Sequence, residues 1–212
     1  MNRVIFLVDG FNVYHSLLDA IRDLGGASTK WLDIHSLCNS YLPHISRDAT
    51  IGGIYYFSAY AEHLRRKDPG KIERHEKYIQ CLRSTGVVDC LGNFKERHFW
   101  CSQCKQRRTR HDEKETDVAI GAKLFEVFFK NECETAVLMT GDTDLVPAVK
   151  TALHLFPAKK IISIFPYLRQ NDELEKLVHA HFKIKANKYL THQLPNPVTL
   201  PNGKRIAKPT MW

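Results

Sequence analysis

Several aspartates stand where the fold of the chain could bring their carboxylates to one place. One ends an apolar run at 4–8, two follow a second apolar run at 135–139, and one lies early in a helical apolar pattern that begins near residue 113. Carboxylates gathered in a partly desolvated cleft raise one another's pKa, and a divalent cation relieves that repulsion. Mg²⁺ and Mn²⁺ prefer such oxygen ligands, acidify water and neutralise charge on a phosphodiester. The candidates are Asp9, Asp117, Asp142 and Asp144, with Asn12 three residues beyond the first.

Each of these aspartates also has a purely structural explanation. Asp9 precedes Gly10 and could form a simple turn, whereas Asp142 and Asp144 could cap a helix, and Asp117 could be an acid in a first helical turn. A shared metal site is the better hypothesis. If each aspartate had only a structural role, all four would have to reach the same edge of the sheet by accident.

The elements that would position these residues alternate between strands and helices. Apolar runs predict strands at 4–8, 54–58, 135–139 and 160–165, and a further strand from residue 86 through 90 that continues as a hairpin arm to residue 100. Helices are expected after residue 10 and over 69–83, 113–131 and 145–155, the third of them largely buried. This order predicts an open, mostly parallel α/β sheet flanked by helices, whose ligands gather at the carboxyl ends of the strands.

Composition limits the class of protein. The 212 residues are 43% hydrophobic and 25% charged, which is ordinary globular usage, and the apolar run at 4–8 is too short for a signal peptide or a membrane span. We expect a cytoplasmic protein with one domain over 1–190 and a basic, proline-containing tail over 191–212, extended or serving as a linker. The formal charge of +8 favours a polyanionic partner. Oligomeric state stays open, a homo-oligomer included.

Three sequence blocks together resemble a known family. They are Phe-Leu-Val-Asp-Gly-Phe-Asn at 6–12, Glu-Lys-Glu-Thr-Asp-Val at 113–118 and Met-Thr-Gly-Asp-Thr-Asp-Leu at 139–145. In order and spacing they resemble the NYN domain of the PIN-like nucleases, particularly its LabA-like bacterial branch. The resemblance implies a Rossmann-like PIN fold and metal-dependent ribonuclease activity. By position it implies acidic metal-site residues at Asp9, Asp117, Asp142 and Asp144, and polar residues of the same pocket at Asn12 and Thr140.

A basic insert at about 95–112 carries the one close cysteine pair. Cys101 and Cys104 form half of a tetrahedral zinc site, and His98 and His111 are the nearest candidates to complete it, with Cys90 less convenient. A redox pair, or a hairpin without metal, are the alternatives. The insert would hold cations beside the acidic cleft to grip phosphates, while Phe99 or Trp100 could stack on an unpaired base. The cations are Arg97, Lys105, Arg107, Arg108 and Arg110.

Four functions compete on this evidence. The leading hypothesis is a metal-dependent endoribonuclease that uses Mg²⁺ or Mn²⁺ on single-stranded RNA, with structural Zn²⁺ in the insert. A non-catalytic RNA-binding or regulatory module of the same fold is the first alternative, and a nuclease acting on DNA is the second. A phosphatase of the haloacid dehalogenase type is disfavoured, because Asp9-Gly10-Phe11 lacks the second aspartate of its nucleophile motif.

Overall fold

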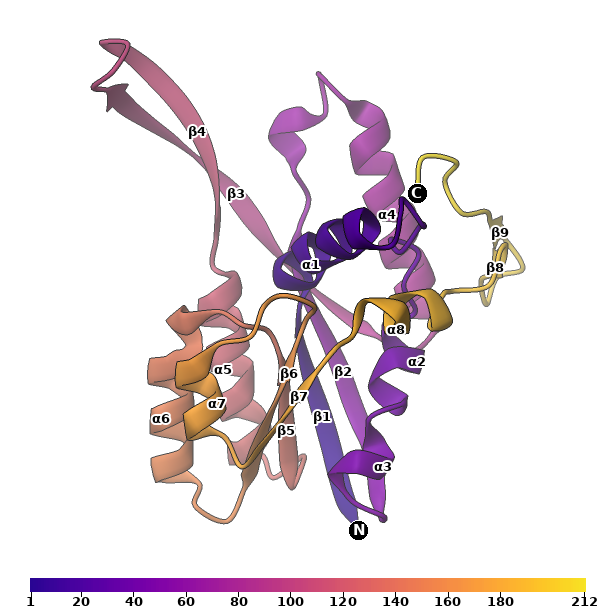
Figure 1. The fold of residues 1–212 in the computed structure, drawn as a ribbon, viewed down its shortest axis with the longest axis vertical. Coiled ribbons are helices and arrows are strands. Elements are labelled where there is room, and N and C mark those ends of the chain that lie inside the picture. Colours follow the sequence, from indigo (N-terminus) through magenta and orange to yellow (C-terminus); the bar gives the residue numbers. More distant parts are fainter.

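The computed structural model describes the backbone of all 212 residues and every side chain except those of Cys101 and residues 108–114. A seven-stranded sheet in the order β4-β3-β2-β1-β5-β6-β7 forms the centre of the molecule (Figure 1). All neighbouring strands are parallel except β3 and β4, which form an antiparallel hairpin. The predicted α/β fold class, an open and mostly parallel sheet of the Rossmann-like PIN type, is confirmed.

The strands of this sheet are β1 (Asn2–Asp9), β2 (Ala49–Ala59), β3 (Val88–Cys101), β4 (Gln106–Lys114), β5 (Thr135–Met139), β6 (Lys160–Phe165) and β7 (Ala180–Lys183). The helices are α1 (Gly10–Asp23), α2 (Ile34–Asn39), α3 (Leu42–Ile45), α4 (Pro69–Ser84), α5 (Thr116–Phe129), α6 (Val146–Leu155), α7 (Asp172–Leu177) and α8 (Ala186–Thr191). Short 3₁₀ turns η1 (Glu62–Leu64) and η2 (Thr143–Leu145) and a small hairpin of β8 (Val198–Thr199) and β9 (Arg205–Ile206) complete the chain.

Two hydrophobic cores cover the two faces of the sheet. Helices α5, α6 and α7 pack on one face, whereas α1, α2, α4 and α8 cover the other (Figure 1). Residues Val4 to Val8 of β1 are all buried and alternate between the two cores, because successive side chains of a strand point to opposite faces. This burial on both sides explains why β1 is a continuous apolar run that ends at its first charged residue.

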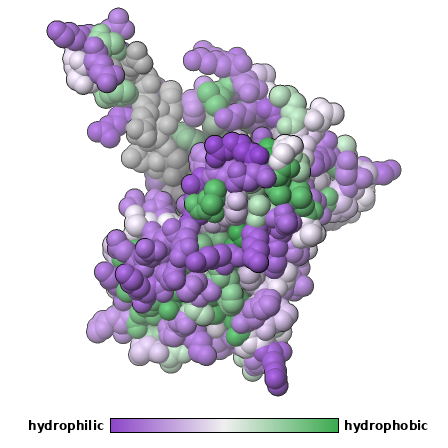
Figure 2. Space-filling model, viewed as in Figure 1, coloured by the Kyte–Doolittle hydropathy of each residue, from purple (hydrophilic) through white to green (hydrophobic). Residues whose placement is uncertain are grey.

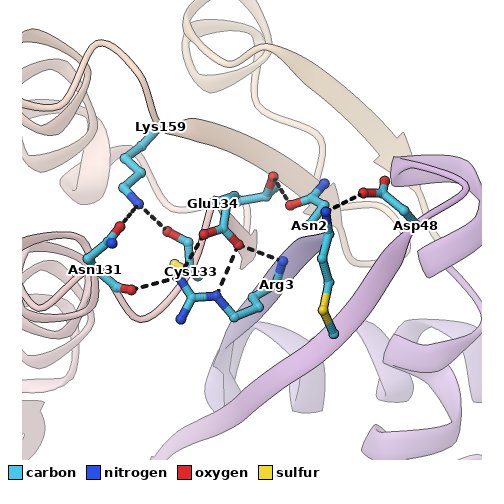
Figure 3. Close-up of polar contacts among 9 residues, drawn as sticks. Asn2, Arg3, Asp48, Asn131, Cys133, Glu134 and Lys159 are labelled. Atoms are coloured by element: carbon cyan, nitrogen blue, oxygen red, sulfur yellow. Dashed lines mark hydrogen bonds and ion pairs between the residues drawn. The ribbon is translucent and has the colours of Figure 1, made fainter.

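Polar contacts fix β1 and β5 together at the edge where they begin (Figure 3). The Arg3 side chain donates from Nε and Nη2 to the two carboxylate oxygens of Glu134, at 3.2 and 2.7 Å, and the Arg3 backbone N–H donates to the same carboxylate at 2.7 Å. These hydrogen bonds lower the pKa of Glu134 to about 2. Asn2 accepts from the Thr135 hydroxyl at 2.9 Å. The register set here determines which residues meet at the opposite, carboxyl edge.

Two predicted elements differ from those observed. Strand β2 begins at Ala49 rather than at residue 54. It can continue through Gly52-Gly53 because a register shift opposite Val4 and Ile5 of β1 accommodates one extra residue of β2. Helix α5 begins at Thr116 rather than residue 113, since 113 and 114 belong to β4. Helix α5 buries one side, with Ile120, Leu124 and Val127 in the core, but the expected burial does not extend to its other side, where Val118 is 76% and Phe129 is 83% exposed.

The last segment of the chain is packed against the body of the protein. We predicted an extended tail over 191–212, but Val198 and Ile206 are buried in the core that α1 and α4 cover. The indole of Trp31 donates to the Pro195 carbonyl at 3.1 Å, and the Trp212 ring lies 5.9 Å from the Trp31 ring. The prolines suggested an extended tail, but the apolar residues between them bury this segment. The division of the chain at residue 190 stays a prediction.

The surface drawn in Figure 2 is mainly hydrophilic, with separate apolar patches. In the part of the chain that the structure describes, we find no helix that is both long and apolar enough to cross a bilayer.

The packed end of the chain can be tested by Ile206→Ala. We expect the substitution to lower the free energy of unfolding by about 2–3 kcal/mol, as usual for a buried large-to-small change, because Ile206 is 4% exposed. Arg205→Ala, which changes the exposed neighbour in the same strand, should leave stability within about 0.5 kcal/mol. Urea unfolding followed by circular dichroism measures both. Equal stability of the two variants would mean that the segment is detached in solution.

Candidate metal centre

The carboxyl ends of β1 and β5 lie side by side at the centre of the sheet. Val8 pairs with Met139, so that Asp9 and the loop that starts at Thr140 leave the sheet at the same edge. Strand order reverses at this point, because the chain from β1 continues to β2 on one side whereas β5 lies on the other. Such a switch point leaves a crevice between the loops, which is where open α/β sheets bind ligands.

Hydrogen bonds hold Asp9 and the loop after β5 in one network. The Thr140 hydroxyl donates to Asp9 Oδ2 at 2.8 Å, and the Asn12 backbone N–H donates to Asp9 Oδ1 at 2.9 Å. Asn12 Oδ1 accepts from the Gly141 N–H at 3.1 Å, and Thr140 Oγ1 accepts from the Asp142 N–H at 3.1 Å. Asn12 and Thr140, both expected in the pocket, therefore fix the two acidic loops relative to each other.

Asp117 reaches the same edge by way of the hairpin. Strand β3 runs beyond the sheet, and β4 brings the chain back until Lys114 pairs with Asn93, close to the carboxyl end of β2. Glu115 then adopts a left-handed conformation with φ of 84°, and α5 begins at the next residue. Asp117 in its first turn is consequently placed beside the crevice, although α5 follows neither β1 nor β5.

The structure brings three of the four predicted carboxylates together. Asp9, Asp117 and Asp142 each offer an oxygen within 4.8 Å of the others, and we refer to them as the carboxylate triad. Asp144 is exposed on η2 and is not part of the triad; its backbone N–H donates to Asp142 Oδ1 at 3.0 Å. Asp9 and Asp142 thus also act as caps for α1 and η2, so that the structural and the functional explanation apply to the same side chains.

Electrostatics favour a cation in the triad. Asp9 is only 4% exposed, and burial raises the pKa of its carboxyl group, with the charge of Asp142 as a further contribution. The hydrogen bonds from Asn12 and Thr140 act in the opposite direction. Hard oxygen ligands in a site of concentrated negative charge fit a divalent ion such as Mg²⁺ or Mn²⁺. The triad could therefore hold a divalent metal.

A cavity of about 410 Å³ opens over the triad and contains residues that sequence analysis missed. His15 and Arg169 line it together with Phe11 and Thr116. His15 follows Asn12 by three residues, a helical spacing that places both on one side of α1 and that could have indicated it. Arg169 lies in the loop after β6 and donates to Asp19 at 2.5 Å; no spacing in the sequence connects it to the aspartates.

The loop that carries Asp142 approaches the loop after β6 so closely that only glycine fits at residue 141. A Cβ atom on Gly141 would lie 1.7 Å from the carbonyl oxygen of Arg169. Asn171 Nδ2 donates to the Gly141 carbonyl at 3.1 Å, which closes the contact from the other side. The position of Asp142 therefore depends on the segment that also presents Arg169.

The basic insert forms the hairpin of β3 and β4, which projects from the body of the protein (Figure 1). We call β3 and β4 beyond Asn93 the hairpin arm. Arg97, Lys105 and Arg107 are exposed on it, as is Trp100 at 67% exposure. Cys104 is exposed in its turn, and His98 Nε2 lies 3.4 Å from Glu96. The side chains of Cys101, Arg108, Arg110 and His111 lie outside the described residues, so that the zinc site stays a prediction.

The fold and the site together define an α/β domain of nuclease type, with three carboxylates that could hold a metal at the switch point of its sheet. The family model of the NYN domain matches residues 3–183, and the chain belongs to this family. NYN domains are generally nucleases, which agrees with the resemblance that the three sequence blocks carried.

Two relatives extend the comparison. A 6-hydroxy-3-succinoylpyridine 3-monooxygenase, HspA, of Pseudomonas putida is 24% identical over 247 residues, which covers 99% of this chain and 75% of the relative. The crystal structure of a protein of unknown function from Vibrio parahaemolyticus superimposes with a TM-score of 0.58 at 16% sequence identity, covering 87% of this chain and 93% of that one. This second likeness shows the fold alone.

The buried charge of Asp9 predicts a gain in stability for Asp9→Asn. Without metal, we expect the variant to be more stable than the wild type by about 1 kcal/mol at pH 7, because it removes a desolvated carboxylate at a functional site. The folded-state pKa of Asp9 lies above its unfolded value. The advantage should therefore be full above the folded-state pKa and shrink as pH falls through it towards the unfolded value. Thermal unfolding in EDTA between pH 7 and 4 measures it.

Mn²⁺ provides the internal control for this comparison. Because an ion that binds only the folded state stabilises it, Mn²⁺ should raise the melting temperature of the wild type and have a smaller effect on Asp9→Asn. A variant that is less stable than the wild type without metal would contradict the electrostatic account of Asp9.

The contact between residue 141 and the loop after β6 predicts that Gly141→Ala is destabilising. We expect a loss of about 2–3 kcal/mol, since the Arg169 backbone must move to make room for the methyl group. Gly52→Ala is the matched control, because the new methyl group would lie 3.5 Å from its nearest neighbour. Urea unfolding compares the two, and an equal cost at both positions would show that the tight contact is absent in solution.

Proposed function

We propose that this protein is a metal-dependent endoribonuclease that hydrolyses phosphodiester bonds of single-stranded RNA at the carboxylate triad. The observation that carries the proposal is the convergence of Asp9, Asp117 and Asp142, from separate parts of the chain, to within 4.8 Å at the switch point. Membership of the NYN family supports the hydrolytic class.

The triad would hold Mg²⁺ or Mn²⁺, and a bound ion of this kind acidifies water and neutralises charge that develops on a phosphodiester. The residues of the chain then have separable tasks. Asn12 and Thr140 hold the carboxylates in place through the bonds described above. Arg169 supplies a cation on the wall of the same cavity, where a phosphate would meet it, and His15 offers a group that can accept or return a proton.

The charge distribution supports a nucleic acid as substrate. The net charge of +8 coexists with an acidic centre, so that cations away from the triad can hold the strand while the acids bind the metal. Arg97, Lys105 and Arg107 of the hairpin arm are exposed for this purpose, and we assign the same role to Arg108 and Arg110. Exposed Phe99 and Trp100 offer faces on which unpaired bases can stack.

A second candidate comes from the P. putida relative, whose name describes the oxidation of a substituted pyridine. A cavity of about 790 Å³, with tyrosine and phenylalanine in its walls and three cations, adjoins the triad. It has room for a small aromatic acid. We rank this candidate second, because monooxygenation also requires an electron donor, whereas hydrolysis requires only the metal and water.

End-labelled single-stranded RNA incubated with Mn²⁺ or Mg²⁺ tests the proposal. We expect cleavage at internal bonds that EDTA abolishes and that Asp142→Asn reduces on the order of a hundredfold, the effect of removing a few kcal/mol of charge stabilisation. Asp172→Asn is the matched control, since it removes an exposed carboxylate outside the triad. Cleavage that survives Asp142→Asn would exclude the triad as the active centre.

Three further assays, each with a different substrate, separate the other functions. A DNA strand of identical sequence measures the preference for RNA, and p-nitrophenyl phosphate tests for phosphatase activity. Oxygen uptake with a hydroxypyridine acid and NADH tests for the monooxygenase. RNA that binds but is never cleaved would favour a non-catalytic module.

A further inference from the structure

A second cavity, of about 790 Å³, adjoins the one over the triad, and its walls combine aromatic rings with cations. We call it the aromatic cavity. Tyr56 of β2 and Tyr78 of α4 are buried in its walls, whereas Tyr14 of α1 is 37% exposed. Phe11 and Phe94 meet edge to face with ring centroids 5.8 Å apart. Trp212 lies 5.5 Å from the Tyr78 ring, so that the end of the chain completes the wall.

Three cations gather on the wall of this cavity. Lys71 and Arg74 are one helical turn apart on α4, and Lys30 joins them from the loop before α2. Burial lowers the pKa of the Lys30 ammonium group, and the neighbouring charges of Arg74 and Lys71 lower it further. Asp68 compensates part of this charge, with an oxygen 3.9 Å from Arg74. A net positive charge therefore faces the cavity.

Two neutral polar groups lie among the aromatic rings. Ser58 Oγ and His75 Nε2 are 3.4 Å apart and both line the cavity. Burial lowers the pKa of His75 to about 4, so that its ring is neutral at pH 7. A hydroxyl group and a neutral imidazole can donate and accept hydrogen bonds, as the edge of a nucleobase requires.

The aromatic cavity is continuous with the metal centre. Phe11, His15 and Asp142 line both cavities, so a chain that occupies one can enter the other without leaving the surface of α1. We infer that the aromatic cavity is a nucleotide subsite, which holds one unpaired nucleotide of the RNA next to the scissile bond, its base against the rings and its phosphate against Lys30, Lys71 and Arg74. This inference rests on the proposed nuclease function and names part of its substrate recognition.

The chemistry of the walls favours a nucleotide over a small aromatic acid. A carboxylate brings one charge on a short arm, whereas a nucleotide separates its planar base from its phosphate by a sugar. The cavity supplies both kinds of contact, with rings from α1, β2, β3, α4 and Trp212, and three cations from α4 and the loop before α2. Because every base has a π-face, stacking on such rings tolerates all four bases.

Binding of nucleoside 5′-monophosphates to the full-length protein in EDTA tests the inference apart from cleavage. Isothermal titration calorimetry should show binding of all four monophosphates, and at least tenfold weaker binding of the corresponding nucleosides and of nicotinate. The double variant Lys71→Ala, Arg74→Ala should weaken binding of the monophosphates on the order of a hundredfold, since each of the two lost ionic hydrogen bonds amounts to about tenfold.

Two further variants make the test specific. Lys150→Ala with Lys176→Ala removes the same charge from exposed positions outside both cavities and should change affinity less than twofold. Tyr14→Ala, at an exposed ring, should weaken binding of every base by a similar factor. If the double variant loses its fold, the exposed Lys71→Ala alone replaces it.

The outcomes separate the two proposals. If the Lys71 and Arg74 variants bind the monophosphates as tightly as the control variants do, the nucleotide subsite is overturned. Nicotinate that binds as tightly as the monophosphates would also overturn it. Monophosphate binding that depends on these residues, in a protein that cleaves no RNA with Mn²⁺, would overturn the nuclease and leave the subsite standing.

Discussion

The buried carboxylate of Asp9 is the constraint on which the rest of the site depends. A negative charge at the end of the central strand is costly without compensation, and the fold supplies the Asn12 N–H and the Thr140 hydroxyl for that purpose. These bonds join the start of α1 to the loop after β5. Gly10 permits this turn, since a Cβ there would lie 2.6 Å from the Phe57 carbonyl oxygen of β2. The hydrogen bonds that compensate the charge of Asp9 thus also align the start of α1 with the loop after β5.

The hairpin arm solves a topological problem for the third carboxylate. Strands β1 and β5 present Asp9 and Asp142 directly, but Asp117 belongs to a helix that comes after an excursion beyond the sheet. Because β4 returns antiparallel to β3, α5 starts at the edge from which β3 left. The arm therefore delivers Asp117 to the triad and also carries exposed cations away from the acidic centre, which separates charges of opposite sign that would otherwise neutralise each other.

Sequence alone predicted the fold, and the convergence of Asp9 and Asp142, for one physical reason: parallel strands buried on both faces are apolar runs, and their ends mark one edge of the sheet. Asp9 and Asp142 follow directly from that rule. Arg169 and the cations on α4 could not be predicted, because their contacts depend on how distant loops and helices pack. The burial of Ile206 was missed because proline dominated the interpretation of that segment. The exposure of Phe129 was missed because apolar residues on much of the circumference of α5 were taken to indicate a largely buried helix.

Helix α1 connects the two cavities and explains how one short segment serves both. Its first turns present Asn12 towards the loop of Asp142, and Phe11 and His15, four residues apart, to both cavities. One turn beyond Asn12, the hydroxyl oxygens of Ser16 and Tyr189 are 2.5 Å apart, a buried contact that anchors α1 against α8. A movement of α1 would change the metal site and the aromatic cavity together. The aromatic cavity and the triad therefore share one supporting helix.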